Sequence, residues 1–220
     1  MEKTDASAPY HLPQRPPGAR TLERLLAAAE DQLREEEVDL FTIQKVLDRT
    51  GLSVGAFYHH FPDKTALLHA VQDRMHARLE PRIVAALADE ARVRESLEEA
   101  VDHCVDILID NMLEERELLR AFTVLSVFDP VMRRKGEQIN HIRRSAFLEA
   151  VLEAHREEIG HPDPDEAMGM AYAMLTSVMN TRLLFLGPDS ELRFGVTDDG
   201  IFRQLKLSLG SFLRGNGASS

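Results

Sequence analysis

The chain has 220 residues, of which 44% are hydrophobic, and its formal net charge is -11. This length and composition can supply a sizeable core and suggest one small domain plus one larger domain. The single cysteine, Cys104, excludes an internal disulfide and suits a reducing compartment, so we expect a cytoplasmic protein. The longest uncharged stretch, residues 167–181, has only 15 residues, which argues against a membrane-spanning helix.

The N-terminal segment is rich in proline and has no apolar run, so it does not resemble a secretory signal peptide. We expect residues 1–19 to form a disordered arm, which contains Arg15 and ends just before Arg20. Residues 1–80 carry 10 Lys and Arg against 13 Asp and Glu, a net of -3, and the remainder carries a net of -8. The acidic larger part is therefore not expected to bind nucleic acid.

Two short helical patterns meet at Gly51, and a third pattern follows at once. Thr42 can cap the first helix, and Gly51 can end it because glycine adopts a left-handed conformation without steric cost. Ser53 can then cap the second helix, and Asp63 the third. Two helices joined by so tight a turn are typical of a helix-turn-helix, whose second helix enters the major groove of DNA.

The second helix of this pattern has two different sides. Phe57 and Phe61 are four residues apart and are expected to face the core. Small residues at the start of the other side, Gly55 above all, would let the backbone approach base edges. Val54 and Ala56 could then contact thymine methyl groups.

Phosphate contacts are expected from Tyr58, His59 and Lys64, which would fix the register of the protein on the duplex. Taken alone, Tyr58 or His59 could equally be an exposed residue on a solvated helix that contacts no DNA. The residues cluster on one side, and this favours the DNA interpretation.

The run SVGAFYHHFPDKTALL at residues 53–68 resembles the recognition-helix signature of the TetR (tetracycline repressor) family of transcriptional regulators. The resemblance covers residues 20–70, with residues 21–33 as the first helix of the family. It implies an all-α fold with a three-helix DNA-binding domain at residues 20–68, a helical ligand-binding and dimerisation domain at residues 69–214, and a flexible tail at residues 215–220. The candidate DNA-contacting residues are Arg20, Thr42, Lys45, Ser53, Val54, Gly55, Ala56, Tyr58, His59 and Lys64.

The chain departs from the family pattern in two ways. Glu35, Glu36 and Glu37 stand where the family usually has a glycine after its first helix, so this connection could stay helical for longer or bend differently. The net negative charge of the first 80 residues is also unusual for a DNA-binding domain and predicts modest, salt-sensitive affinity.

Downstream of residue 70 the apolar spacing is helical throughout, without an alternating strand pattern. We expect helices at residues 63–79, 93–113, 115–128, 131–159, 166–186 and 200–214, with Pro81 ending or kinking the first. The last two helices carry more apolar surface than a monomer readily covers, and the resemblance implies a homodimer through them. The expected interface residues are Met179, Leu183, Ile201, Leu205, Leu209 and Phe212. Alternatively, the final helix packs on its own subunit.

A ligand-responsive regulator needs an effector. We expect this effector to be an unknown, largely apolar small molecule that binds among the central helices. Its binding would shift the dimer between two arrangements and release the near-palindromic operator, so a repressor is the expected role. The candidate pocket residues are His103, Cys104, Leu108, Phe122, Leu125, Phe128, Met132, Asn140, His141, Met174, Ser177 and Val178. Such residues at helical spacing are more often plain core, and His103 and His141 could be core or surface histidines.

Two other classes of protein remain open. An all-helical enzyme acting on an apolar substrate is conceivable, but the sequence offers no catalytic motif, no cofactor motif and no metal site. The cluster His161, Asp163, Asp165 and Glu166 reads as a capped loop. The third class is a helical interaction protein that has lost DNA binding.

Overall fold

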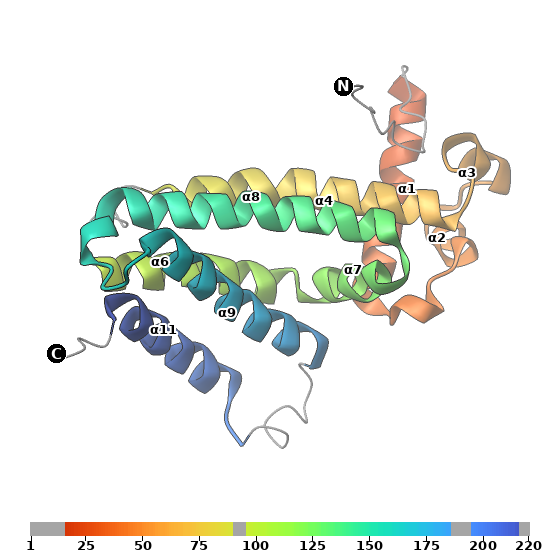
Figure 1. Ribbon diagram of the computed structural model, residues 1–220. Helices are drawn as coiled ribbons and strands as arrows, with labels where there is room; N and C mark the ends of the chain where they lie inside the picture. The colour runs from red at the N-terminus through yellow and green to blue at the C-terminus, as the bar shows by residue number, and fades with distance from the viewer. Residues whose placement is uncertain (1–15, 90–95, 186–194, 216–220) are drawn as a thin grey trace.

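The computed structural model describes residues 16–89, 96–185 and 195–215, and these residues form nine α-helices and two short 3-10 helices with no strand. The predicted all-α fold is therefore confirmed. Figure 1 shows a small group of helices at one end of a longer helical body.

The small group contains α1 (Pro16–Glu35), a 3-10 turn (Val38–Leu40), α2 (Ile43–Thr50) and α3 (Val54–His60). Three phenylalanines form the centre of its core: Phe41, Phe57 and Phe61 are all fully buried. Helix α1 packs across α2 and α3 and supplies Leu25 and Leu33 to the same core.

Helix α1 starts earlier than expected. Residues 16–19 were predicted to belong to a disordered arm, but they form the first turn of the helix. Proline is tolerated there because the amide that it lacks would have had no intrahelical acceptor. Residues 1–15 of the predicted arm and residues 216–220 of the predicted tail lie outside the described residues.

The acidic connection after α1 bends rather than extending the helix. The amide of Glu36 still donates to the Gln32 carbonyl at 3.0 Å, and the chain then turns through the 3-10 segment. The buried side-chain amide of Gln32 donates to the Leu40 carbonyl at 3.4 Å, which holds this turn against α1.

Helix α4 (Lys64–Leu87) runs from the small group along the whole body. We expected Pro81 to end or kink it, but the helix continues for six residues beyond the proline. Leu79, Ile83 and Leu87 explain this continuation, because they recur every four residues and are all buried. Their packing offsets the hydrogen bond that an exposed proline removes.

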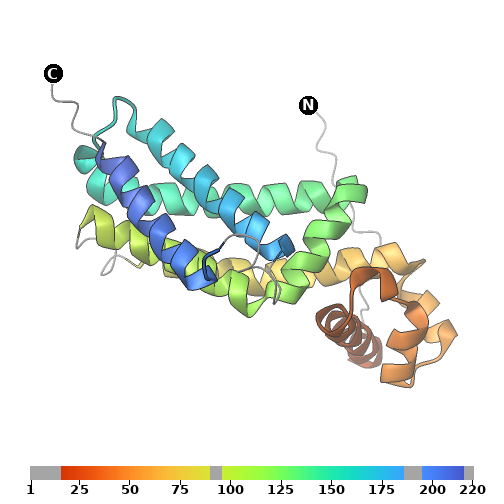
Figure 2. The same cartoon turned by 90° about the horizontal axis from the view of Figure 1, so that it is seen from below.

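The rest of the body consists of α6 (Leu97–Glu114), α7 (Arg116–Phe128), α8 (Pro130–His155), a 3-10 turn (Arg156–Glu158), α9 (Pro164–Phe185) and α11 (Asp198–Arg214). Helix α8 packs along α4 and also contacts α7 and α9, while α11 packs on α6 and α9. Figure 2 shows α9 and α11 together on one side of the body, away from the small group.

The end of α11 is held by a close backbone contact between two glycines. The amide of Gly160 donates to the Leu213 carbonyl at 2.9 Å, and the backbones of Gly160 and Gly215 touch. A Cβ atom on Gly160 would overlap the Arg214 carbonyl oxygen, and a Cβ atom on Gly215 would overlap the Gly160 carbonyl oxygen. This contact fixes α11 against the loop that precedes α9.

Within the described ranges, no helix combines the length and the apolar character needed to cross a bilayer.

Candidate functional site

The predicted caps of the helix-turn-helix are all present. The Thr42 hydroxyl accepts a hydrogen bond from the Lys45 amide at 3.3 Å, and the Ser53 hydroxyl accepts one from the Ala56 amide at 3.1 Å. Gly51 adopts the left-handed conformation, with φ at 64°, and its amide donates to the Leu47 carbonyl at 2.7 Å. Local sequence thus determines where α2 ends and where α3 begins.

The two sides of α3 differ sharply. Phe57 is fully buried, and its ring centroid lies 5.7 Å from that of Phe61. On the other side Val54 is 54% exposed and Tyr58 is 56% exposed. An apolar and an aromatic side chain are therefore presented to solvent beside a fully packed core.

Gly55 lies between these exposed side chains and is not required by the fold. Its φ angle is not in the left-handed region, and an added Cβ would meet only the Ser53 hydroxyl oxygen, at 3.9 Å. The missing side chain therefore leaves the surface flat without any benefit to internal packing. A flat, exposed helix start is suited to close approach by an external partner.

Three cations beside α3 already have partners. The Lys45 Nζ lies 2.8 Å from a Glu36 carboxylate oxygen, and Arg49 donates two hydrogen bonds to Glu35 at 2.6 and 3.1 Å. These hydrogen bonds, from Lys45 and from Arg49, are the main reason that the pKa values of Glu36 and Glu35 lie below their ordinary value. Glu35 at the end of α1 and Glu36 directly after it thus neutralise two cations on α2, next to the candidate DNA-contacting residues.

Lys64 is the third of these cations, and its Nζ donates to the Phe41 carbonyl at 3.1 Å. The other predicted contact residues are accessible: Arg20, Thr42 and His59 are exposed, and Ala56 is half-buried. Nine of the ten candidates therefore lie in the small group of helices, with Arg20 on α1, and Lys64 begins α4 directly after it.

An ion cluster that the sequence did not reveal joins the small domain to the body. We define this interdomain ion cluster as Glu30 and Arg34 on α1, Arg78 on α4 and Glu115 before α7. Arg78 lies 2.7 Å from Glu30 and 3.2 Å from Glu115, and Arg34 contacts both carboxylates. Burial raises the pKa of Glu30, but the hydrogen bonds from Arg78 and Arg34 outweigh it and leave that pKa below its ordinary value.

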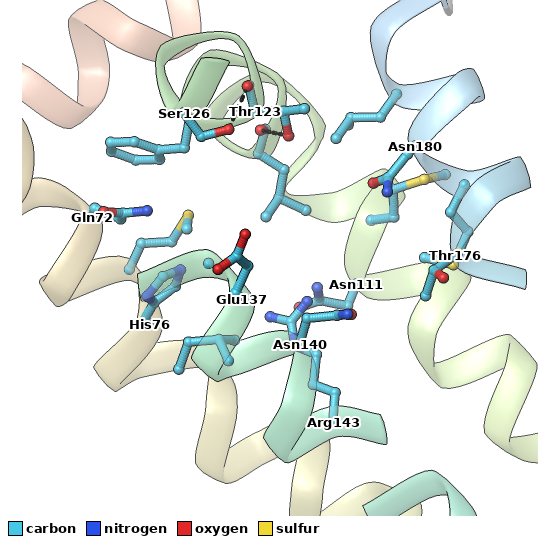
Figure 3. Close-up of a pocket in the computed structure, with 18 of the residues that line it drawn as sticks. Gln72, His76, Asn111, Thr123, Ser126, Glu137, Asn140, Arg143, Thr176 and Asn180 are labelled. Atoms are coloured by element: carbon cyan, nitrogen blue, oxygen red, sulfur yellow. Dashed lines mark hydrogen bonds between the residues drawn. The ribbon is translucent and has the colours of Figure 1, made fainter. Parts of the chain in front are cut away.

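A cavity of about 320 Å³ lies in the body and is lined by residues of α4, α6, α7, α8 and α9 (Figure 3). This volume is at the lower end of the range for small-molecule sites, about 300–1,000 Å³. Of the predicted pocket residues, Leu108, Phe122, Met132 and Asn140 line it. The structure therefore has a cavity among the central helices, and only a minority of the predicted pocket residues line it.

The other predicted residues do not line this cavity: His103, Cys104, Leu125, Phe128, His141, Met174, Ser177 and Val178. The helices turn these side chains elsewhere. Phe128 is 85% exposed, His141 and Ser177 are exposed, and Cys104 is packed in the core, where burial raises the pKa of its thiol to about 12. Helical spacing places residues on a common face, but it does not show which face meets the cavity.

The cavity is also more polar than expected. Side-chain amides, hydroxyls and charged groups alternate with apolar side chains around it (Figure 3). The polar lining residues that the sequence reasoning missed are Gln72, His76, Asn111, Thr123, Ser126, Arg133, Glu137 and Arg143. Burial, and then the charge of Arg143, lower the pKa of His76 to about 4, so this imidazole is neutral near pH 7.

The predicted dimer surface also needs revision. Leu183 and Leu209 are buried within the subunit, so these two side chains cannot lie on a contact surface. Met179 lines the cavity, and Ile201, Leu205 and Phe212 are half-buried, since α11 packs this stripe on α6 and α9. Large apolar side chains that do face solvent on α9 and α11 are Met170, Met174, Phe185 and Leu207.

The acidic residues and the histidine of the loop before α9 have structural roles. Asp163 accepts a hydrogen bond from the Glu166 amide at 3.0 Å, and Arg156 lies 2.7 Å from Asp165. His161 stacks against Phe212, with ring centroids 4.8 Å apart. In the described part of the chain, no three His, Cys, Asp or Glu side chains are grouped so that they could hold a metal ion.

Comparison with known proteins agrees with this architecture. Residues 25–71 match the family described as bacterial regulatory proteins, tetR family. No significant match was found among curated protein sequences.

Solved structures match over almost the whole chain. A protein of Mesorhizobium loti MAFF303099, described as of the TetR family of transcriptional regulators, matches with a TM-score of 0.68 and 19% identity, over 90% of this chain and 98% of its own. Salmonella enterica GusR matches with a TM-score of 0.60 and 22% identity, over 90% of this chain and 97% of its own. The fatty acid degradation regulator FadR of Bacillus halodurans matches with a TM-score of 0.62 and 15% identity, over 93% of this chain and 100% of its own.

At these identities the structures establish the fold, while the sequence match identifies the DNA-binding domain. Residues 25–71 therefore match the family described as bacterial regulatory proteins, tetR family, and the chain shares the fold of solved structures described as regulators of that family.

Proposed function

We propose that this protein is a homodimeric repressor that binds a near-palindromic operator and is released from it by a small molecule. The observation that carries the proposal is the contrast between the two sides of α3. Phe57 anchors the helix in the core, while Val54, Gly55 and Tyr58 lie on its exposed side, where the missing side chain of Gly55 serves no internal packing. Such a helix can enter a major groove without rearrangement of the domain.

The exposed apolar side chains of α9 and α11 support a second copy of this chain as the partner. Met170, Met174 and Phe185 lie on one side of α9, with the exposed Ser177 and Thr181 at intermediate turns of the same helix. Leu207 is exposed on the neighbouring α11. A two-fold contact between these faces would bury both apolar sets in a four-helix arrangement.

The cavity and the DNA-binding domain share helix α4. Gln72, Met75 and His76 line the cavity, and the same helix begins at Lys64, directly after α3. A ligand that fits only one tilt of α4 would change the separation of the two recognition helices. Release then requires that the ligand prefer the arrangement that does not bind DNA, because affinity alone shifts no equilibrium.

Selection of bound duplexes from a random pool tests this proposal directly. We expect two related half-sites with inverted symmetry, spaced so that two recognition helices enter major grooves about 34–36 Å apart. Gly55→Leu should abolish enrichment, because it fills the flat start of α3, while Glu153→Leu on the exposed side of α8 serves as control.

Enrichment of single, unpaired half-sites would contradict the homodimer. No enrichment of any duplex at low salt would contradict DNA binding altogether and favour a helical interaction protein. The oligomeric state is measured separately by sedimentation, where Met174→Glu combined with Leu207→Glu should convert a dimer to a monomer.

A further inference from the structure

We propose that the cavity binds an uncharged, polyhydroxylated ring molecule, chemically a sugar or cyclitol, rather than a fatty acyl chain or an organic cation. The inference rests on the proposed function only in taking this cavity as the effector site. It replaces the largely apolar effector that the sequence led us to expect, and it follows from four features of the cavity wall.

The first feature is a side-chain amide in the cavity wall that makes no hydrogen bond to the described part of the chain. Asn111 on α6 is only 8% exposed, yet its side-chain amide has no hydrogen-bond partner among the residues that the structure describes. Across the cavity Gln72 on α4 is 2% exposed, and its Nε2 donates to the Met132 carbonyl at 3.1 Å while its Oε1 has no partner. The Asn111 amide lines the cavity and can both donate to and accept from a ligand there.

The second feature is the state of the cavity hydroxyls. Thr123 donates to the Leu119 carbonyl at 2.8 Å, and Ser126 donates to the Thr123 carbonyl at 2.7 Å. Their protons are committed to the helix backbone, so the oxygens can only accept. Thr176 on α9, whose hydroxyl donates to the Tyr172 carbonyl at 2.9 Å, is in the same state. The ligand must therefore bring several donors, as a set of hydroxyl groups does.

The third feature is charge. Arg143 is neutralised by Glu80, with two hydrogen bonds at 3.0 and 2.5 Å. The remaining ionic groups of the lining, Arg133 and Glu137, have opposite charge and lie one turn apart on α8. The wall thus offers no net charge to compensate a buried carboxylate or ammonium group, and burying either one without compensation is unfavourable.

The fourth feature is the distribution of apolar groups. Apolar side chains reach the cavity from all five helices, among them Met75, Leu108 and Phe122, and they share its wall with the polar side chains named above. A ring with C–H groups on its faces and hydroxyls around its edge suits a wall that carries both kinds of side chain. Figure 3 shows Glu137 directed into the same space, where its carboxylate can accept from two neighbouring hydroxyls.

The test measures ligand binding to the full-length protein without DNA, by calorimetry and thermal shift. The probes are three matched panels: neutral saccharides and inositols with their methyl and phenyl glycosides, saturated fatty acids of eight to sixteen carbons, and tetraalkylammonium and aryl cations. We expect binding only within the first panel. Binding confined to fatty acids or to cations overturns the proposal, and so does the absence of binding by every neutral probe at millimolar concentration.

Two variants locate the site and its chemistry. Asn111→Leu removes the unpartnered amide at similar volume and should weaken the best neutral probe by about tenfold or more while the protein stays folded. Glu137→Gln keeps an acceptor and should weaken the same probe only severalfold, without dependence on salt. A loss of a hundredfold or more that diminishes with added salt would indicate a cationic ligand and overturn the proposal. Glu153→Gln on the outer side of α8 is the matched control.

These results are separable from the proposed function. A neutral probe that binds at Asn111 but leaves duplex binding unchanged supports the ligand class and contradicts release by this ligand. Duplex release by a fatty acid or a cation supports the regulator and contradicts the ligand class.

Discussion

The helix-turn-helix and the helical body differ in what determines the position of a side chain. In residues 42–68 each turn has its own signal: a hydroxyl cap, a left-handed glycine, or a pair of phenylalanines four residues apart. In the body most such signals are absent from the helix interiors. Whether a side chain there faces the core, the cavity or solvent depends on which helices pack against its own. The DNA surface is thus fixed locally, whereas the cavity is fixed by tertiary packing.

This difference has a consequence for stability. Phe57 and Phe147 are both fully buried, one beneath the exposed side of α3 and one beside the cavity, where its ring lies 5.5 Å from that of Tyr172. The same substitution at the two positions should destabilise the protein similarly but damage different activities.

The largest expected effects come from these two phenylalanines. Phe57→Ala and Phe147→Ala should each lower the free energy of unfolding by about 3–5 kcal/mol, because each leaves a cavity in a packed core. Urea titration measures the loss. Phe57→Ala should abolish duplex binding, whereas Phe147→Ala should impair ligand binding first, since Tyr172 lines the cavity and donates to Asn140 at 2.9 Å. Equal loss of duplex binding in both variants, at temperatures where both are folded, would remove the distinction between the two regions.

The next effect concerns the interdomain ion cluster, which connects the two regions. Glu115→Gln should cost about 1–3 kcal/mol, because it leaves Arg34 and Arg78 with one carboxylate in a partly buried site. The arginines are about one-third exposed, so we expect less than the loss of a fully buried pair. A variant as stable as the wild type would show that the cluster contributes nothing to the junction.

The same cluster predicts a pH dependence. The pKa of Glu30 is below its ordinary value of 4.5 in the folded protein, so the folded state binds fewer protons than the unfolded state. This contribution to stability is therefore complete above that ordinary value and is lost as the pH falls through the lowered one. In Glu30→Gln the free energy of unfolding should vary less with pH below about 5, and an unchanged slope would contradict the assignment.

The helix-turn-helix could be predicted from sequence almost residue by residue. Thr42, Gly51 and Ser53 act within three or four residues of themselves, so their roles do not depend on distant parts of the chain. Glu35 and Glu36 show the limit of this approach. Their identity suggested a change in the connection, but only the fold shows that they bind Arg49 and Lys45.

The cavity could not be predicted in the same way. Its walls come from five helices, and a small rotation of any one of them replaces one set of lining residues with the next. Periodicity found the apolar candidates Leu108, Phe122 and Met132, because these lie on a buried face. It gave no reason to select Asn111 or Gln72, since a buried amide is indistinguishable in sequence from an exposed one.

A smaller effect distinguishes contact types within the DNA surface itself. Tyr58→Ala should weaken all duplexes by about tenfold, because a phosphate contact carries no sequence information. Val54→Ala should instead change which bases are preferred at one position of each half-site. Competition binding with the selected operator and single-base variants measures both. A change of preference in Tyr58→Ala, with total affinity intact, would show that the roles are assigned wrongly.

The smallest expected effect tests the acidic edge of the same surface. Glu36→Gln removes the carboxylate that lies 2.8 Å from the Lys45 Nζ and leaves that cation available to phosphate. Duplex affinity at low salt should rise severalfold. The slope of log affinity against log salt concentration should steepen by up to about one, because one phosphate contact is gained. Glu153→Gln, which makes the same charge change far from α3, controls for net charge. If both variants raised affinity equally, the acidic edge would act only through the overall charge, and the ion pair with Lys45 would not regulate access to DNA.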